Sequence, residues 1–469
     1  MAISIPVAGT EDGFPPPREP VPQPAAPLSS LPGHFRAHWE TLSTPERDQL
    51  AAGWDARELP LVEEDPEGDP AIRAVTFLYR EPQATAVILS ANAMVHPDTA
   101  ASCEFEALPD GIWALTWRMP ADWEASYRIT AHTGPLPAPW QVGNDRRTVR
   151  LAADAGGPDP QNPALGTGMT GSPTSVLRLP AAPPAGWLAV PTPAVESGAS
   201  IMGEPTPMRA PALLRTGSSQ GRVSGPAPGP RFVSGDFVPG LELRRVRDRQ
   251  ANRLRNVWLY RPRAAGRVPT PLILLHDGQV WAKYQNLAAT LDQAIADGVL
   301  PPLHVAMVDS VDVPTRGREL SGPTGSVDFV ARDLLPGLRR TLPVTPDPLQ
   351  TVISGASYGG LAALWQLARY PQAAGTALAQ SPSLWRYDLT EPLLSAQVPI
   401  RVRIQAGRYE PSIHEPAGRL NTALAGAGVD TAFRSISGGH DWAWWHPWLI
   451  RGLADLFRED QGNPTSGSA

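Results

Sequence analysis

The chain has 469 residues, of which 42% are hydrophobic and 18% are charged, and its net charge at pH 7 is −6. This length allows two or three domains with an enzyme-sized core, while the acidic balance provides no electrostatic footprint for nucleic acid. No run of about 18 apolar residues is present, so we expect no membrane span. Cys103 is the only cysteine, which excludes an internal disulfide framework and a cysteine-rich metal site.

The N-terminal part of the chain divides into a tail and a β-rich region. Residues 1–30 are rich in proline and are expected to form an extended tail, and without a basic start and an apolar stretch they do not resemble a secretory signal, so we expect a cytoplasmic protein. A helix is predicted over 33–55. Branched and aromatic residues then alternate in short runs, at 72–80, 84–91, 112–119 and 125–133. Residues 31–153 are therefore predicted to form a small antiparallel, immunoglobulin-like β-sandwich.

A second region rich in proline and glycine, residues 154–232, separates this part from the rest. We expect a linker that docks in part onto a domain surface, with 196–230 free. From residue 233 onward, strands alternate with helices; the predicted strands are 256–262, 271–278, 304–311, 349–356, 376–381, 400–407 and 431–437. This alternation predicts a mostly parallel sheet covered on both faces, an α/β-hydrolase domain over 233–460, followed by a disordered tail over 461–469.

The stretch "SGASYGG" at 354–360 contains the pattern G-x-S-x-G. The pattern alone is weak, but here a predicted strand precedes it and a predicted helix follows it, which is the context of a nucleophile elbow. Gly355 and Gly359 leave room around the strained serine. We therefore predict that Ser357 is a catalytic nucleophile and that the backbone N–H of Tyr358, at the helix N-terminus, stabilises an oxyanion.

A nucleophilic serine needs a base, which in this fold follows the acid in chain order. His440 comes after the last predicted strand and the flexible pair Gly438-Gly439, and is the predicted base. His446 is a competitor, but it lies in a tryptophan-rich helical segment and is interpreted as a packed surface histidine. His414 precedes the last strand, which is the wrong place in this order.

The acid is expected after the strand 400–407, which points to Glu410. Its role would be to orient the imidazole and to stabilise the imidazolium. Asp441 directly follows the predicted base and faces awkwardly for that task, and Glu415 and Asp430 are less well placed.

A second oxyanion donor is expected from the loop after an early strand, here 276–279. Asp277 and Gly278 are the candidate donors, and Gly278 would permit close approach of the backbone to a substrate. The alternative is that this "DG" pair is only a turn signal.

Several motifs occur in the order seen in one family: "LILLHDGQVWA", "VDVPTRGRELSGP", "ISGASYGGLAALW", "LAQSPSLWR", "QAGRYEP" and "SGGHDWAWW". The chain resembles the cytoplasmic enterochelin (ferric enterobactin) esterases, which have an esterase D-like α/β-hydrolase domain. The resemblance extends to their N-terminal domain through "AIRAVTFLYR", "WALTWRMPADWEASYRI" and "SVLRLPAAPPAGW". It implies hydrolysis of the serine-lactone backbone of a catecholate siderophore, a small-molecule partner that carries iron as part of the substrate, with no other cofactor.

The resemblance also implies roles for individual residues. Ser357, His440 and Glu410 match the nucleophile, base and acid. Arg316 and Glu319 in "TRGREL" match a family signature near the site. Because ferric catecholates are anionic and aromatic, the residues that could pair with them are Arg316, Arg318, Arg386 and Arg408, and those that could stack on the catechol rings are Trp385, Trp442, Trp444 or Trp445.

Alternatives remain open for the tryptophans and for the function. Helix packing at spacings of three and four explains the tryptophans equally well. One alternative function is a feruloyl or acetylxylan-type esterase whose N-terminal sandwich binds carbohydrate. Another is a degenerate hydrolase that serves as a binding module, against which the intact Ser, acid and His set counts.

Overall fold

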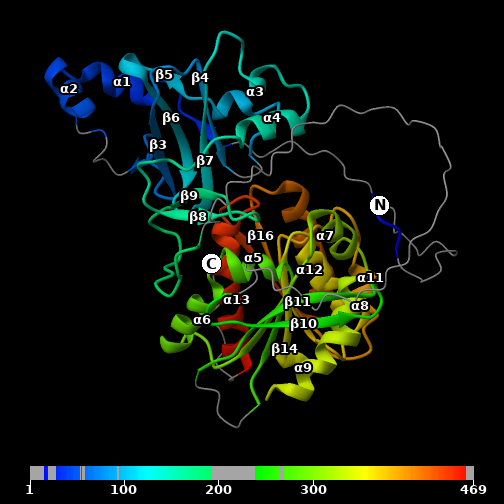
Figure 1. Cartoon of the computed structure of the whole chain (residues 1–469). Coiled ribbons are helices and arrows are strands. Elements are labelled where there is room, and N and C mark those ends of the chain that lie inside the picture. The colour runs from blue at the N-terminus through cyan, green and yellow to red at the C-terminus, as the bar shows by residue number, and fades with distance from the viewer. Residues whose placement is uncertain are drawn as a thin grey trace, which may run out of the picture.

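The computed structural model of the chain consists of a β-sandwich followed by an α/β domain (Figure 1). It describes residues 15–18, 28–52, 54, 59–91, 94–192, 238–263 and 269–460. The predictions for most of the N-terminal tail, for the free part of the linker and for the C-terminal tail lie outside these residues.

The N-terminal domain packs two antiparallel sheets face to face. The first has the order β1-β6-β3-β2 with β5 beside β6, and the second has the order β4-β7-β9-β8. The strands are β1 (Ser29–Ser30), β2 (Leu61–Glu64), β3 (Ile72–Arg80), β4 (Ala86–Ala91), β5 (Glu106–Ala107), β6 (Ile112–Pro120), β7 (Glu124–His132), β8 (Leu165–Thr167) and β9 (Pro173–Arg178). The short helices are α1 (His34–Thr41), α2 (Thr44–Ala52), η2 (Ala100–Cys103), η3 (Pro109–Gly111), α3 (Pro139–Val142) and α4 (Arg146–Ala153).

Alternation along the strands creates the sandwich core. Phe77 of β3 points between the sheets and meets the ring of Tyr127 of β7 edge-on at 5.0 Å. Its neighbour Leu78 points the other way, where Phe35 and Trp39 of α1 cover the outer face. The predicted period-two pattern therefore corresponds to burial on both faces of the first sheet.

Two predictions for this region are wrong in detail. The helix predicted over 33–55 is broken into α1 and α2, because the N–H and hydroxyl of Ser43 bond Glu46 at 2.7 and 2.6 Å and start a new helix. The sandwich also extends beyond 31–153. Strand β1 pairs with β6, and β8 and β9 complete the second sheet, so that 154–178 belongs to the domain and not to a linker.

The C-terminal domain contains an eight-stranded sheet in the order β10-β11-β13-β12-β14-β15-β16-β17. Strands β12 to β17 run parallel and β10 and β11 are antiparallel, in agreement with the predicted α/β-hydrolase class. The strands are β10 (Glu242–Asp248), β11 (Arg253–Tyr260), β12 (Leu272–Leu275), β13 (His304–Val308), β14 (Thr351–Ala356), β15 (Thr376–Gln380), β16 (Arg401–Gly407) and β17 (Asp430–Ile436).

Helices cover both faces of this sheet. The helical elements are α5 (Gly278–Lys283), α6 (Leu287–Ala296), α7 (Val313–Leu320), α8 (Ser326–Phe329), η4 (Val330–Leu334), α9 (Leu335–Thr341), η5 (Pro348–Gln350), α10 (Tyr358–Arg369), α11 (Thr390–Leu394), α12 (Pro411–Gly426) and α13 (Trp442–Asp460). Leu272 and Leu274 of β12 pack with α8 to α12 on one face. Ile273 and Leu275 of the same strand pack with α5, α6 and α13 on the other, so the strand is buried on both sides.

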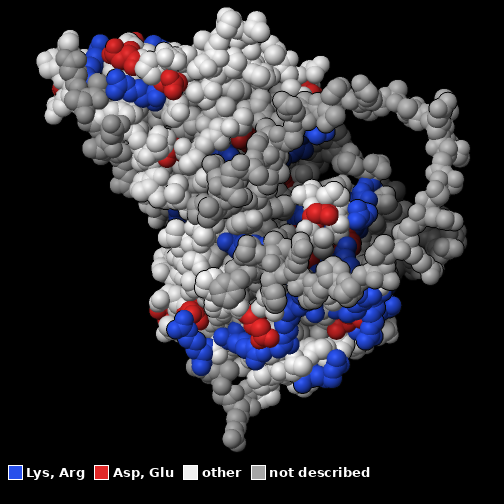
Figure 2. Space-filling view, viewed as in Figure 1, with Lys and Arg blue, Asp and Glu red and all other residues white. Residues whose placement is uncertain are grey.

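The two domains meet where β7 and β8 lie against α13 (Figure 1). Figure 2 shows that basic side chains gather on the lower part of the C-terminal domain as drawn, where β10 and β11 lie, with acidic groups among them. Glu242 of β10, for example, pairs with Arg244 and Arg261, each at 2.6 Å. These two arginines therefore share one acidic partner at this surface.

Candidate active site

Ser357 occupies a sharp turn between β14 and α10. Its backbone has φ 62° and ψ −118°, a conformation that a non-glycine residue adopts only when its surroundings enforce it. Its N–H donates to the carbonyl of Gln380 on the neighbouring strand at 2.9 Å. A Cβ on Gly355 would lie 2.7 Å from the carbonyl carbon of Gly359, so the turn closes only because Gly355 lacks a side chain. The geometry is that of the predicted elbow.

His440 and Glu410 lie in contact beyond the ends of β17 and β16. The Nδ1 atom of His440 is 2.5 Å from Oε1 of Glu410, whose side chain is only 2% exposed. Because Nδ1 is engaged by the carboxylate, Nε2 is the ring nitrogen that can exchange a proton with a reacting hydroxyl. The ring of Trp445 meets the imidazole edge-on at 4.7 Å and limits its rotation.

The second oxygen of Glu410 is also held. It accepts hydrogen bonds from the Ser381 hydroxyl at 2.8 Å and from the Gly407 N–H at 2.7 Å. Ser381 in turn accepts the indole N–H of Trp445 at 2.9 Å. The carboxylate is thus fixed in the orientation that addresses His440.

Two serines after β15 were not predicted as site residues. Ser381 positions Glu410, and Ser383 places its hydroxyl 3.5 Å from the hydroxyl of Ser357. The Ser383 N–H also donates to the Ser357 carbonyl at 3.3 Å. The available signal was their place directly after a buried strand, at the edge of the sheet where such sites form.

The loop after β12 is anchored by a buried ion pair. The carboxylate of Asp277 accepts Nε and Nη2 of Arg316 at 2.7 and 2.8 Å and the hydroxyl of Ser310 at 2.5 Å. Burial alone would raise the pKa of Asp277, but the charge and hydrogen bonds of Arg316 outweigh it and lower that pKa below its usual value. Tyr358, at the start of α10, packs its ring under the Arg316 guanidinium at 5.7 Å. Its backbone N–H belongs to the first turn, which has no intrahelical acceptor.

Glycine is required at position 278 for a different reason from the predicted one. A Cβ there would lie 2.2 Å from the carbonyl carbon of Met307, so glycine is required for the packing of α5 against β13. Close approach to a substrate is not needed to explain it. Its backbone N–H as an oxyanion donor stays a prediction.

The structure also gives Arg316 and Glu319 roles that differ from substrate binding. Arg316 directs its guanidinium at Asp277, and its side chain is 11% exposed. Glu319 accepts Arg253 and also Arg255, the latter at 2.5 Å. Buried charges are stable only when paired, so both side chains are used within the protein.

Three other predicted substrate contacts lie on accessible surface. Trp385 is half-buried, with its ring 5.9 Å from that of Tyr358. Arg386 is half-buried and stacks over Tyr387 at 5.9 Å, and its Nε has no hydrogen-bond partner among the described residues. Arg408 is exposed, with Nε 3.3 Å from the Ser435 hydroxyl.

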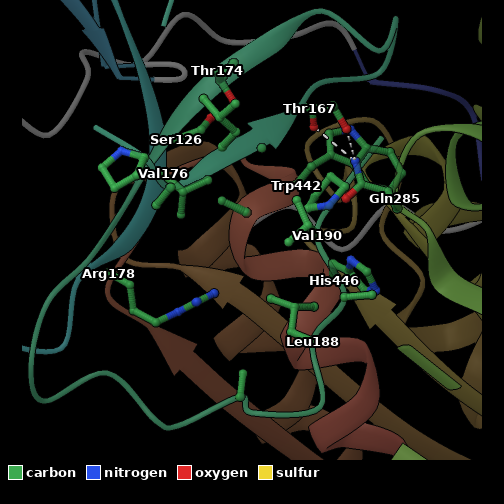
Figure 3. Close-up of a pocket in the computed structure, with 18 residues that line it drawn as sticks. Ser126, Thr167, Thr174, Val176, Arg178, Leu188, Val190, Gln285, Trp442 and His446 are labelled. Atoms are coloured by element: carbon green, nitrogen blue, oxygen red, sulfur yellow. Dashed lines mark hydrogen bonds between the residues drawn. The ribbon is translucent and has the colours of Figure 1, made fainter. Parts of the chain in front are cut away.

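Trp442 faces the junction of the domains. It is buried between Trp281 at 4.9 Å and Trp445 at 5.2 Å, which matches the packing alternative. It lines a cavity of about 240 Å³ between the sandwich and α13 (Figure 3). In this view Arg178 reaches in from the side opposite Trp442.

The competing bases occupy other positions. His446 is buried and not on the surface as expected, and in the described part of the chain neither of its ring nitrogens has a hydrogen-bond partner. Burial lowers its pKa to about 3, so that it stays neutral at physiological pH. His414 bonds the Ser435 hydroxyl at 2.8 Å through Nε2.

The competing acids also have other partners. Asp441 accepts hydrogen bonds from Ser126 and from the backbone of Ala443. Asp430 pairs with Arg401 at 3.0 Å at the start of β17, the end of the strand opposite to His440. Of the acidic side chains considered, Glu410 is the one hydrogen-bonded to the imidazole of His440.

Within the described ranges, no three His, Cys, Asp or Glu side chains are grouped as a metal ion would require. No helix in the same ranges combines the length and apolar character of a membrane span.

Two family models match the chain, one for each domain. Residues 74–188 match the family described as "Enterochelin esterase, N-terminal" and residues 249–456 match "Putative esterase". The iron(III) salmochelin esterase of Escherichia coli O6:H1 is 28% identical over 448 residues, which covers 87% of this chain and 96% of that protein. The iron(III) enterobactin esterase of Dickeya dadantii is 34% identical over 238 residues, and the chain spans 55% of its length.

A solved structure has the same two-domain fold. The ferric enterobactin esterase of Salmonella typhimurium superposes with a TM-score of 0.67 at 21% identity, over 88% of this chain and 99% of that one. The order of the two domains and the similarity along 96% of the Escherichia coli relative support the same assignment. The chain belongs to the enterochelin esterase family, in which an N-terminal sandwich precedes an α/β-hydrolase domain.

Proposed function

We propose that this chain is a serine esterase that hydrolyses the trilactone ester bonds of a catecholate siderophore such as ferric enterobactin. The observation that carries the chemistry is the elbow serine together with the buried His440–Glu410 pair. The observation that carries the substrate is the similarity along 96% of a relative named as an iron(III) salmochelin esterase. Cleavage would release iron for use in the cytoplasm.

The mechanism uses side chains and backbone N–H groups of this chain. Ser357 Oγ attacks the ester carbonyl while Nε2 of His440 accepts its proton, and Glu410 stabilises the imidazolium. The N–H of Tyr358 donates to the oxyanion, with a second donor proposed from the backbone at Asp277 or Gly278. Collapse breaks the ester bond, and His440 gives the proton to the leaving seryl oxygen. Water, deprotonated by His440, then attacks the acyl-enzyme; the acid product leaves as His440 returns the proton to Ser357 Oγ, and no cofactor takes part.

Substrate recognition is proposed for the accessible residues beside the elbow. A ferric catecholate is anionic and aromatic, which suits a half-buried tryptophan, Trp385, followed by a half-buried arginine, Arg386. Arg408 adds an exposed positive charge next to the loop of Glu410. Arg316 has no part in this proposal because its charge is neutralised by Asp277.

The feruloyl or acetylxylan alternative is less favoured, since the matches that cover both domains are to siderophore esterases. A degenerate binding module would not need a buried, multiply bonded acid beside the base.

The deciding experiment compares product formation from enterobactin, iron-loaded and iron-free, with that from a feruloylated sugar, resolved by chromatography. We expect linear dihydroxybenzoyl-serine products from the trilactone and none with the Ser357→Ala variant. Faster cleavage of the feruloylated sugar would overturn the substrate, and undiminished cleavage by the variant would overturn the nucleophile.

A further inference from the structure

The end of strand β7 that faces the C-terminal domain is hydrogen-bonded to Asp441, the residue directly after His440. Oδ2 of Asp441 accepts the backbone N–H of Ser126 at 2.8 Å and its hydroxyl at 2.7 Å. The other oxygen, Oδ1, accepts the Ala443 N–H at 2.8 Å and so caps helix α13. Asp441 is 1% exposed. One buried carboxylate therefore ties together the sandwich, the last helix and the loop of His440.

The same strand end presses on the loop before His440. The Glu124 N–H donates to the Ser437 carbonyl at 3.0 Å. A Cβ on Gly438 would lie only 2.7 Å from the Glu124 carbonyl oxygen, so a side chain there would push the domains apart. The pair Gly438-Gly439, interpreted from sequence as flexible, therefore includes a glycine needed for close contact between domains.

The loop of the acid is contacted as well. Trp123, just before β7, meets the ring of Tyr409 edge-on at 5.0 Å. Tyr409 directly precedes Glu410, and its N–H donates to the Gly438 carbonyl at 3.2 Å. A single segment of the sandwich, residues 123–126, thus supports both catalytic loops.

The junction between the two domains contains buried charged groups, which favour one relative arrangement of the domains. Burial raises the pKa of Asp441, and the hydrogen bonds from Ala443 and Ser126 only partly oppose that effect. Glu124, nearly fully buried, accepts Arg178 from its own domain and lies 3.5 Å from Arg451 of α13. Losing one partner of such a group leaves a buried charge unsatisfied, so the junction has one strongly preferred arrangement.

We propose that Ser126 is a positioning residue for His440, acting through Asp441, so that the sandwich forms a working part of the catalytic site. The proposal rests on the esterase activity proposed above, but not on the identity of the siderophore. Removing the Ser126 hydroxyl leaves Asp441 with one donor fewer and loosens the segment that carries the imidazole. Displacement of a base by about 1 Å costs roughly 100-fold in rate.

The test is Ser126→Ala, with Ser126→Thr as the conservative rescue and Ser90→Ala as the matched control. Ser90 lies on the adjacent strand β4, and its hydroxyl bonds Asp154 within the sandwich, so this control removes the same kind of Ser–Asp bond away from the site. The substrate is p-nitrophenyl butyrate, which is too small to need the sandwich for binding. We expect Ser126→Ala to lower kcat about 10- to 100-fold with little change in KM, and we expect Ser126→Thr and Ser90→Ala to retain kcat.

Two readouts keep the result unambiguous. Thermal unfolding shows whether each variant is folded at the assay temperature. If Ser126→Ala is not folded, Asp441→Asn, which keeps one acceptor oxygen, takes its place in the same measurements. The NMR signal of the His440 Nδ1 proton reports its orientation without any substrate, and it should shift or broaden in Ser126→Ala but not in Ser90→Ala. An unchanged kcat and proton signal in folded Ser126→Ala would overturn the proposal, as would an equal loss in Ser90→Ala. Failure of the wild type to cleave the trilactone while it cleaves the small ester would instead count against the proposed substrate alone.

Discussion

Glu410 holds the imidazole of His440 with one carboxylate oxygen at 2.5 Å while its other oxygen is bonded by Ser381 and the Gly407 N–H. The two oxygens therefore have separate partners: one contacts His440 and the other contacts the surrounding scaffold. An amide at this position could keep only one of them, because its NH₂ group would face either the imidazole or the Gly407 N–H.

Replacing Glu410 by Gln should consequently lower kcat by about 10² to 10⁴ while KM changes little. Steady-state kinetics on the trilactone measure this split. Glu415→Gln, on helix α12 directly after Glu410 and paired with Arg419 at 3.6 Å, is the control and should retain full turnover. An active Glu410→Gln variant would place the acid elsewhere or remove it from the mechanism.

His440→Ala and His446→Leu form a second pair with opposite expected results. The first removes the proposed base and should cost about 10² to 10⁴ in kcat. The second replaces a buried imidazole whose nitrogens have no partner in the described residues, so leucine should retain activity and increase the free energy of unfolding. Turnover of p-nitrophenyl butyrate and urea unfolding distinguish them. A severe loss of turnover in stably folded His446→Leu would reopen its candidacy as the base.

Arg316→Met tests whether the family signature supports the fold or binds substrate. The variant leaves the buried Asp277 carboxylate without its cation, which typically costs about 3 to 5 kcal/mol of stability. Because the pKa of Asp277 is lowered in the folded state, the stabilisation is present at neutral pH and is lost as the pH falls below about 4, through the folded-state pKa. In urea titrations, the difference in unfolding free energy between wild type and variant should be smaller at pH 3 than at pH 7.

Arg318→Met is the matched control, since that side chain is exposed and bonds Thr315 at 3.0 Å. It should leave the unfolding free energy within about 0.5 kcal/mol of wild type. A raised KM for the siderophore with unchanged stability in Arg316→Met would restore its interpretation as a substrate contact.

Acid should destabilise the protein below about pH 6.5 through two buried histidines. Burial lowers the pKa of His276 to about 4 and that of His446 to about 3. The unfolded chain binds these protons near pH 6.5 and the folded chain does not, so stability falls as the pH decreases from there. At pH 5 each histidine should cost about 2 kcal/mol relative to pH 8. As the pH falls from 8 to 5, the unfolding free energy should therefore decline less steeply for His446→Leu than for the wild type.

The parts of the site that depend on local pattern were predictable. An elbow needs a strand, a turn and a helix in immediate succession, so Ser357 could be recognised from its neighbours. His440 and Glu410 followed from the order of strand ends. These three depend on chain order within one sheet, which short-range periodicity reveals.

The remaining contacts depend on partners that are distant in sequence. The motif "TRGREL" shows that an arginine is present, but not that Asp277, 39 residues away, neutralises it. Ser126 and Asp441 are 315 residues apart, and no local signal links them. Strands β8 and β9 were missed because they are short and lie among prolines and glycines. The break at Ser43 did carry a signal, the S-x-x-E spacing of a capping box.

The cage around Asp441 has a consequence for how this architecture can change over time. Two of its three hydrogen bonds come from Ser126 of the sandwich and one from Ala443 of α13, so an α/β-hydrolase domain without its sandwich would lose two of the three. The sandwich is therefore not an interchangeable accessory. A replacement module would have to supply a serine hydroxyl and a backbone N–H for Asp441, and a carbonyl that packs against Gly438. We therefore expect the two domains to be kept together during evolution.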